Sequence, residues 1–136
     1  MTGEVSPVYA LAKYRGAAMQ TPLRREGTHL SLTADLIRGH TDSIILAQLV
    51  ERDSYGYEIN KAIQERTGGD YELKEATLYS AFRRLEQSGM ITSYWGDATI
   101  GARRRYYAIT PTGQRFYYRN REEWQHAKRI IDTLLP

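Results

Sequence analysis

The stretch "LKEATLYSAFRRLEQSGMITSYW", residues 73–95, decides the fold because a helical pattern in it passes directly into a strand pattern. At about 100° per residue, a helix over 75–88 gathers its apolar side chains within one arc of roughly 100°: Leu78, Ala81, Phe82 and Leu85. The opposite side carries Ala76, Ser80, Arg83, Arg84 and Gln87, with Thr77 and Tyr79 on the flanks. The pattern predicts a helix that packs on a body through one side and exposes a polar, basic side.

A β-hairpin is predicted directly after this helix. Residues 90–95 and 103–109 are rich in residues that favour strands, and the turn "GDATIG" between them has a glycine at each end. Trp95 and Tyr107 are expected in the hairpin core. The arginines of the second strand, Arg103, Arg104 and Arg105, stand at the mouth of the hairpin. Because side chains alternate along a strand, Arg104 is expected on the other face from its two neighbours.

Two helices are predicted before residue 73. The first covers 34–52 and has a broad apolar side, although Gly39 and His40 weaken its first half. The second covers 55–66, with Ser54 as its N-cap and Gly68-Gly69 as its stop. Three helices followed by a hairpin give a mainly α (α+β) fold, the winged helix-turn-helix.

A long last helix is predicted over 111–135, with Thr110 as N-cap and Pro111 at the first helical position. Six of its residues are spaced 3, 4, 3, 4, 3, which is a heptad seam with one polar member: Tyr117, Asn120, Trp124, Ala127, Ile131 and Leu134. We expect this seam, apart from Asn120, to form a dimer interface. The alternative is packing against the first helix of the same chain.

Charge is distributed unevenly along the 136 residues. Residues 74–121 hold 9 Lys/Arg and 3 Asp/Glu, a net charge of +6, whereas residues 1–73 hold 8 and 10, a net charge of −2. A local basic surface favours a polyanionic partner; the alternative is an ordinary solvated face. The expected domains are an N-terminal extension over 1–32, partly flexible, a winged helix-turn-helix over 33–109 and a dimerisation helix over 110–136.

Several functional classes are disfavoured. The sequence has no cysteine, no apolar run near the ~20 residues of a membrane span and no basic, apolar leader at its start, so a cytoplasmic protein is expected. Its three histidines lack the spacing of a metal site. With no nucleophile–base set or phosphate loop in sight, we expect neither an enzyme nor a cofactor.

In a winged helix-turn-helix the third helix enters the DNA major groove, which is ~12 Å wide. Ser80, Arg83 and Arg84 are then expected to meet phosphates or base edges, and the hairpin arginines a backbone or the minor groove. Lys74 and Thr77, at the helix start, are placed for phosphate contact, the alternative being capping alone. For Arg83 and Arg84 the alternative is surface pairing with Glu86 or Glu72, and Tyr79 either reaches a phosphate or packs.

The segments "YGYEINKAI" (55–63), "EATLYSAFRRLEQSGMITSYW" (75–95) and "GARRRYYAITPTG" (101–113) resemble the PadR family of winged-helix transcriptional regulators. The resemblance covers about residues 36–135 and is greatest to the small multidrug-sensing repressors of that family. It implies a homodimer on a pseudopalindromic DNA operator, with exchanged C-terminal helices, that leaves DNA when an aromatic compound binds. Two positions depart from the usual pattern: Ser80 stands where proline is frequent, and Ala102 where proline or glycine is.

The resemblance also implies an effector site at the dimer centre, where Trp124 would stack on a planar aromatic molecule. The residues expected around that molecule are Asp42, Ser43, Leu46, Tyr117, Asn120, Trp124, Ala127 and Ile131. This surrounding is more polar than in the multidrug-sensing relatives. Asp42 favours a cationic ligand, and Trp124 supplies a face for it; the alternative is that Trp124 serves only the dimer core.

A second function of a different class is a winged-helix protein-interaction module without a DNA role. Such a surface is expected to present large apolar residues on the outer side of the helix over 75–88. That side instead carries small, polar and basic residues, which favours DNA.

Overall fold

The computed structural model of the chain describes residues 32–97, 101 and 103–136. It consists of two units, residues 1–38 and 39–136, each described by itself. In the first unit the described part is helix α1 (Leu32–Arg38), where Arg38 forms an ion pair of 2.8 Å with Asp35. The predictions for residues 1–31 lie outside the described residues.

The predicted first helix over 34–52 is wrong in its extent. The chain leaves the helical path at Gly39-His40, and α2 (Thr41–Glu51) begins after His40, whose backbone has φ −113° and ψ 14°. The physical reason is the Gly39-His40 pair, which already weakened the helical pattern of the sequence, since glycine is a poor helix former.

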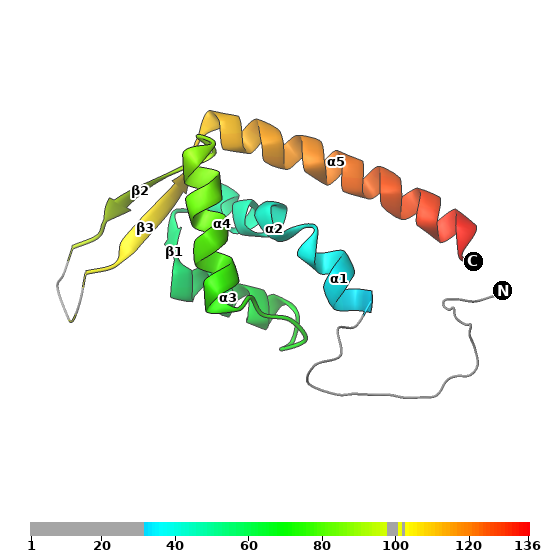
Figure 1. The fold of residues 1–136 in the computed structure, drawn as a ribbon, viewed down its shortest axis with the longest axis horizontal. Helices are drawn as coiled ribbons and strands as arrows, with labels where there is room; N and C mark the ends of the chain where they lie inside the picture. The colour runs from blue at the N-terminus through cyan, green and yellow to red at the C-terminus, as the bar shows by residue number, and fades with distance from the viewer. Residues whose placement is uncertain (1–31, 98–100, 102) are drawn as a thin grey trace. The chain divides into compact units, whose positions relative to one another are not determined.

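The second unit contains a three-stranded antiparallel sheet and four helices in its described part (Figure 1). After α2 come β1 (Ser54–Tyr55), α3 (Gly56–Arg66), α4 (Glu75–Gln87), β2 (Ile91–Trp95), β3 (Arg105–Ile109) and α5 (Pro111–Leu134). The helices, the hairpin of β2 and β3 and the long last helix confirm the predicted fold class. Strand β1 was not predicted: Ser54 pairs with Tyr107 rather than capping α3 through its side chain.

One hydrophobic core joins α2, α3, α4 and the sheet. Its centre is Phe82, whose ring stacks on that of Tyr107 at 3.9 Å between centroids. The fully buried side chains include Ile45 and Leu46 from α2, Ile59 from α3, the apolar stripe of α4, and Ile91 from β2. Tyr107 lies in the core as predicted. The prediction for Trp95 was wrong, because Trp95 stands at the end of β2 and is 56% exposed.

The sequence "TPTG" ties the end of α4 to the start of α5. Thr110 Oγ1 accepts a hydrogen bond from Gly113 N at 3.1 Å, which confirms the predicted N-cap, and donates one to Gly89 O at 2.7 Å. Its backbone N–H donates to Met90 O at 3.0 Å. Gly113 is buried against the same backbone, so that a Cβ there would clash with Met90 O and lie 2.8 Å from Ile109 Cγ1. The hairpin of β2 and β3, here called the wing, and helix α5 therefore leave the body from one fixed point.

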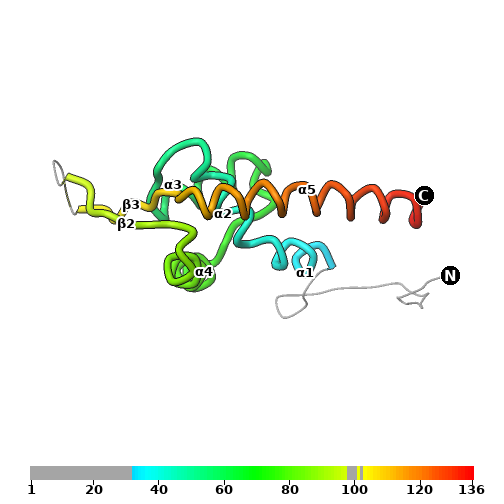
Figure 2. Tube along the Cα trace, turned by 90° about the horizontal axis from the view of Figure 1, so that it is seen from above, coloured from blue at the N-terminus to red at the C-terminus, as the bar shows by residue number. Residues whose placement is uncertain are grey.

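Helix α5 packs on α2 through its first turns, where Phe116, Tyr117 and Asn120 are partly buried. Every residue from Arg121 to Pro136 is exposed. Figures 1 and 2 both show α5 running along α2 and continuing beyond it. More than half of this helix is thus exposed in the described part of its own unit.

Candidate nucleic-acid interface

Helix α4 lies at the edge of the second unit, where Figure 2 looks down its axis. Its apolar stripe is buried, whereas Ser80 and Arg83 are exposed, as predicted for its outer side; Thr77, predicted on a flank, is exposed as well. Lys74 is the N-cap residue, but its side chain makes no capping hydrogen bond and is exposed. An exposed cation beside the N–H groups of a helix start is a favourable arrangement for a phosphate.

The orientation of α4 relative to α3 depends on Asn60, a residue that the sequence analysis missed. Its Nδ2 donates to Leu73 O at 2.7 Å, and its Oδ1 accepts from Leu73 N at 2.8 Å. Leu73 is itself buried, one residue before the N-cap. The only hint in the sequence is a polar residue next to the apolar positions of α3, and such residues are usually solvated.

Tyr79 occupies the flank of α4 that faces α3. Its ring meets Phe82 edge-on at 5.5 Å. A Cβ added to Gly56 would lie 2.6 Å from the Tyr79 hydroxyl oxygen, so the hydroxyl rests against the first residue of α3. The side chain still has 44% of its surface exposed. Tyr79 therefore packs against α3 while part of its side chain stays exposed.

Arg84, predicted on the outer side, instead reaches α2. Its guanidinium makes two hydrogen bonds with the Asp42 carboxylate, one from Nη2 to Oδ1 and one from Nε to Oδ2 at 3.4 Å. The hydrogen bond to Asp42 raises the pKa of Arg84 above its ordinary value. The acidic partners considered from sequence, Glu86 and Glu72, are engaged elsewhere. Arg83 has no ion pair with any residue of the described part of the chain.

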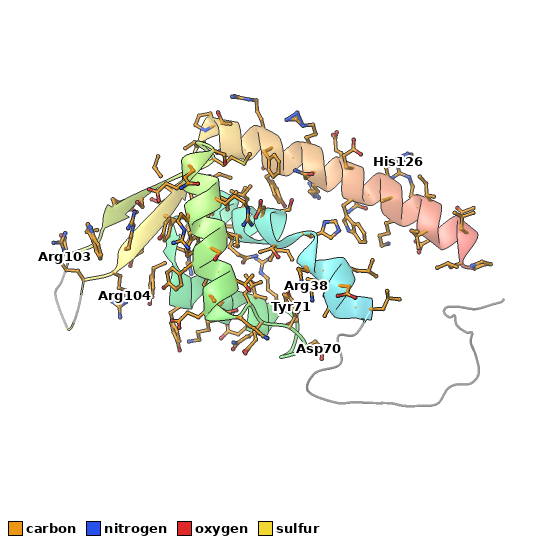
Figure 3. All side chains as sticks on the ribbon, viewed as in Figure 1. Arg38, Asp70, Tyr71, Arg103, Arg104 and His126 are labelled. Carbon is orange, nitrogen blue, oxygen red and sulfur yellow. The ribbon has the colours of Figure 1, made fainter. Side chains whose placement is uncertain are left out.

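The three hairpin arginines have different surroundings. Arg105 donates from Nη2 to Ser93 Oγ at 2.9 Å and to Glu86 Oε1 at 3.4 Å, so its charge is shared with a carboxylate. The other two lie over aromatic rings, Arg103 at 5.5 Å from the centroid of Trp95 and Arg104 at 4.9 Å from that of Tyr55. In Figure 3, Arg103 and Arg104 point to opposite sides at the end of the hairpin, as the alternation predicts.

Tyrosines stiffen the hairpin, another feature that the sequence analysis missed. Tyr55, Tyr106 and Tyr94 face one another across the three strands, and the rings of Tyr94 and Tyr106 stack at 5.7 Å. The Tyr94 hydroxyl donates to Asp53 Oδ2 at 2.6 Å, and this hydrogen bond raises the pKa of Tyr94. The row of rings joins the hairpin to the segment before α3, which limits how far the wing bends.

The residues predicted around an effector do not share one environment. Leu46 is fully buried in the core, and Asp42 is paired with Arg84. Ser43, Tyr117 and Asn120 are partly buried, and the Asn120 amide donates to Phe116 O at 3.2 Å. Ala127 and Ile131 are exposed on α5. Trp124 is 43% exposed, and its ring meets that of His40 edge-on at 5.0 Å.

Two further findings concern the described residues alone. None of their helices combines the length and the apolar character that crossing a bilayer requires. They contain no group of three histidine, aspartate or glutamate side chains arranged to hold a metal ion. Residues 98–100 and 102 of the predicted hairpin turn lie outside the described part.

Comparison with known proteins places this architecture in a family. The model of the "Transcriptional regulator PadR-like family" matches residues 45–119, from α2 to the first turns of α5. The structure of a transcriptional regulator from Clostridium thermocellum is 51% identical, covers 75% of this chain and 99% of that chain, and has a TM-score of 0.70. A PadR family transcription regulator from Clostridium difficile is 36% identical, with 72% and 100% covered and a TM-score of 0.63. An uncharacterized protein from Lysinibacillus sphaericus is 46% identical over 102 residues, 75% of this chain and 94% of its own length. The chain belongs to the PadR-like family of transcriptional regulators, which are DNA-binding proteins and not enzymes.

Proposed function

We propose that the protein is a homodimeric repressor that binds a pseudopalindromic DNA operator through α4 and the wing, and that a small aromatic molecule releases it. The observation that carries the DNA role is the division of α4 into two sides. One side is buried around Phe82, and the other exposes Ser80 and Arg83, which forms no ion pair within the described part of the chain. A protein-binding surface would bury large apolar side chains there.

The proposed DNA contacts follow from the surroundings of each side chain. Lys74, Thr77 and Tyr79 lie at the start of α4, where phosphates meet helix N-termini. Ser80 and Arg83 face the groove, and Arg103 and Arg104 reach the backbone or minor groove from the wing. Arg84 and Arg105 each share their charge with a carboxylate and add less to the attraction for phosphate.

The proposed dimer covers the exposed apolar side of α5. Trp124, Ile131 and Leu134 retain 43%, 51% and 67% of their surfaces in the single chain. Covering such side chains is favourable by about 25 cal/mol per Å² of apolar surface, and their heptad spacing suits a helix from a second copy. A two-fold dimer presents α4 twice, which fits an operator with two half-sites about one helical turn apart.

The DNA role is tested by footprinting the protein on the promoter of its own gene and by titrating bound duplex at increasing salt. We expect a protected dyad and an affinity that falls linearly with salt on logarithmic axes. Arg83→Ala should weaken binding and reduce the slope. Arg121→Ala, which removes the same charge from an exposed site on α5, is the matched control. An absence of binding at about 50 mM salt would instead support a protein-interaction module.

The proposed effector site is tested by tryptophan fluorescence in the absence of DNA. The chain has two tryptophans, so Trp95→Phe leaves Trp124 as the sole reporter, and Trp124→Phe leaves Trp95. A planar cationic aromatic dye should quench the first variant and leave the second unchanged, because the dye would stack on Trp124. If both variants respond alike, or neither does, the effector site is wrong and the seam serves only the dimer.

A further inference from the structure

The ion pair between Arg84 and Asp42 joins α4 to α2. Asp42 lies outside residues 45–119, which the family model matches. Arg84 lies on α4, and Asp42 lies 42 residues earlier in the first turn of α2. A carboxylate in a first helical turn is itself stabilised by the helix dipole. A guanidinium that makes two hydrogen bonds with it is held in one geometry, which a lysine could not reproduce.

The position of Arg84 around α4 explains why this contact matters. At about 100° per residue, Arg84 lies as far from the buried stripe as Tyr79 does, on the opposite flank, so the sequence-based placement of Arg84 on the outer side was wrong. Tyr79 rests against Gly56 of α3, and Arg84 is bound to Asp42 of α2. The buried stripe selects which side of α4 faces the core, and polar contacts on its two flanks restrain the small roll about the helix axis that remains. The two flank contacts together fix the roll.

From this geometry we infer that Asp42 is a positioning residue for DNA binding: through Arg84 it sets the roll of α4, and Arg84 itself makes no phosphate contact. The inference rests on the proposed function. It departs from the sequence-based expectation that Arg84 grips DNA and that Asp42 receives a cationic effector. The pair is partly exposed, with 56% of the Arg84 and 29% of the Asp42 side-chain surface accessible, so both residues can be replaced without opening the core.

The two roles for Arg84 predict different salt dependence. A phosphate contact releases counterions, so its loss reduces the slope of log affinity against log salt by about 0.9 per contact. A positioning residue releases no counterions from DNA, so its loss leaves this slope nearly unchanged, apart from the weak screening of the partly exposed ion pair by salt. The experiment measures binding of a fluorescent duplex carrying the footprinted dyad, from about 50 to 200 mM salt. The variants are Asp42→Asn, Arg84→Gln, the combination of both, and Arg83→Gln.

We expect Asp42→Asn and Arg84→Gln each to weaken binding by about two- to thirty-fold with an unchanged slope, and the combination to be no weaker than either. Arg83→Gln should reduce the slope by about 2, because a dimer carries two copies. A matched control is the ion pair of Arg66 and Glu51, which joins α3 to the other end of α2. Replacing Glu51 by Gln should leave DNA affinity unchanged.

A reversed pair separates positioning from direct contact even if a single variant unfolds. Asp42→Arg combined with Arg84→Asp restores the attraction with its polarity exchanged, and should bind DNA more tightly than Arg84→Asp alone. If the reversed pair shows no recovery, if Asp42→Asn binds as tightly as the wild type or more tightly, or if Arg84→Gln reduces the slope as Arg83→Gln does, the inference is wrong while the proposed function stands. A wild type that binds no DNA would remove the proposed function and the inference with it.

Discussion

Gly113 illustrates how one missing side chain sets the junction of wing and last helix. It lies inside the first turn of α5, where the carbonyl of Met90 and the side chain of Ile109 occupy the space that a Cβ would need. This close approach allows the Thr110 hydroxyl to accept a hydrogen bond from Gly113 N at the start of α5 and to donate one to Gly89 O, just after α4.

Gly113→Ala is therefore expected to lower the free energy of unfolding by about 1–3 kcal/mol, the usual cost of overpacking. Helix propensity alone predicts the opposite sign, since alanine is favoured over glycine by about 1 kcal/mol in a helix interior. Urea unfolding of the variant and of Gln114→Ala, an exposed neighbour in the same turn, distinguishes the two effects. Unchanged or increased stability of Gly113→Ala would show that the junction can relax.

Tyr107 gives a prediction about alkaline pH. Burial raises the pKa of its hydroxyl above the ordinary value of 10.0, while the nearby Arg105 opposes the shift. Because the folded-state pKa is the higher one, the contribution of Tyr107 to stability is complete below about pH 10 and is lost as the pH rises through the folded-state pKa. In urea unfolding, the wild type should then lose stability relative to Tyr107→Phe as the pH rises above about 10, and the two proteins should keep a constant difference below that pH. Parallel curves for the two proteins would contradict this.

At the scale of elements, α4 is held by a combination of apolar and polar contacts. The stripe around Phe82 supplies most of the buried surface, and Asn60 fixes the loop that delivers the chain into α4. When one partner of such a buried hydrogen-bonded pair is removed, the group that remains is left unsatisfied and the full desolvation penalty destabilises the fold. The angle between α3 and α4, which matters for the proposed insertion into the groove, therefore depends on this polar residue as well as on the apolar stripe.

Asn60→Asp should lower the free energy of unfolding by about 1–3 kcal/mol, because a carboxylate cannot donate to Leu73 O. Operator affinity should fall with it. Gln64→Ala is the matched control: it removes an exposed hydrogen bond between the same helix and the same loop, the one to Glu72, and surface changes of this kind stay within about 0.5 kcal/mol. Equal stability of the two variants in urea would show that Asn60 does not fix the α3–α4 angle.

At the scale of the whole molecule, α5 is the feature that bears on the proposed dimer. Sixteen residues, from Arg121 to Pro136, are exposed, among them most of the heptad seam. Exposed apolar side chains in such a regular row indicate a protein contact. Their placement on one helix, which leaves the body at the Thr110 junction, makes the geometry of a dimer depend on the direction of α5.

Ile131→Glu combined with Leu134→Glu should convert the protein from a dimer to a monomer, because charges would be buried in the seam. Light scattering after gel filtration measures the mass directly. The matched control is Gln125→Glu with Arg129→Glu, which places acidic residues on the opposite side of the same helix and should leave the dimer intact. A monomeric wild type, or a dimeric seam variant, would rule out this interface.

The sequence by itself determined the two sides of α4, the hairpin, the Thr110 cap and the long last helix, together with the family motifs. These features are local: periodicity, capping and turn residues act over a few positions, so the order of residues specifies them. The sequence also predicted part of the candidate surface correctly, since Lys74, Ser80 and Arg83 are exposed as expected.

Only the tertiary structure decided which charges are available and which are paired. Arg84 bonds to a residue 42 positions away, Arg105 to one 19 positions away, and β1 pairs with a strand about fifty residues later. The hydrophobic periodicity of the sequence does not predict such partners, because an ion pair or a two-residue strand depends on the distance between elements that pack together. The break between α1 and α2 has a local cause at Gly39-His40, but glycine weakens a helix by only about 1 kcal/mol, so the sequence pattern alone left open whether the helix continued.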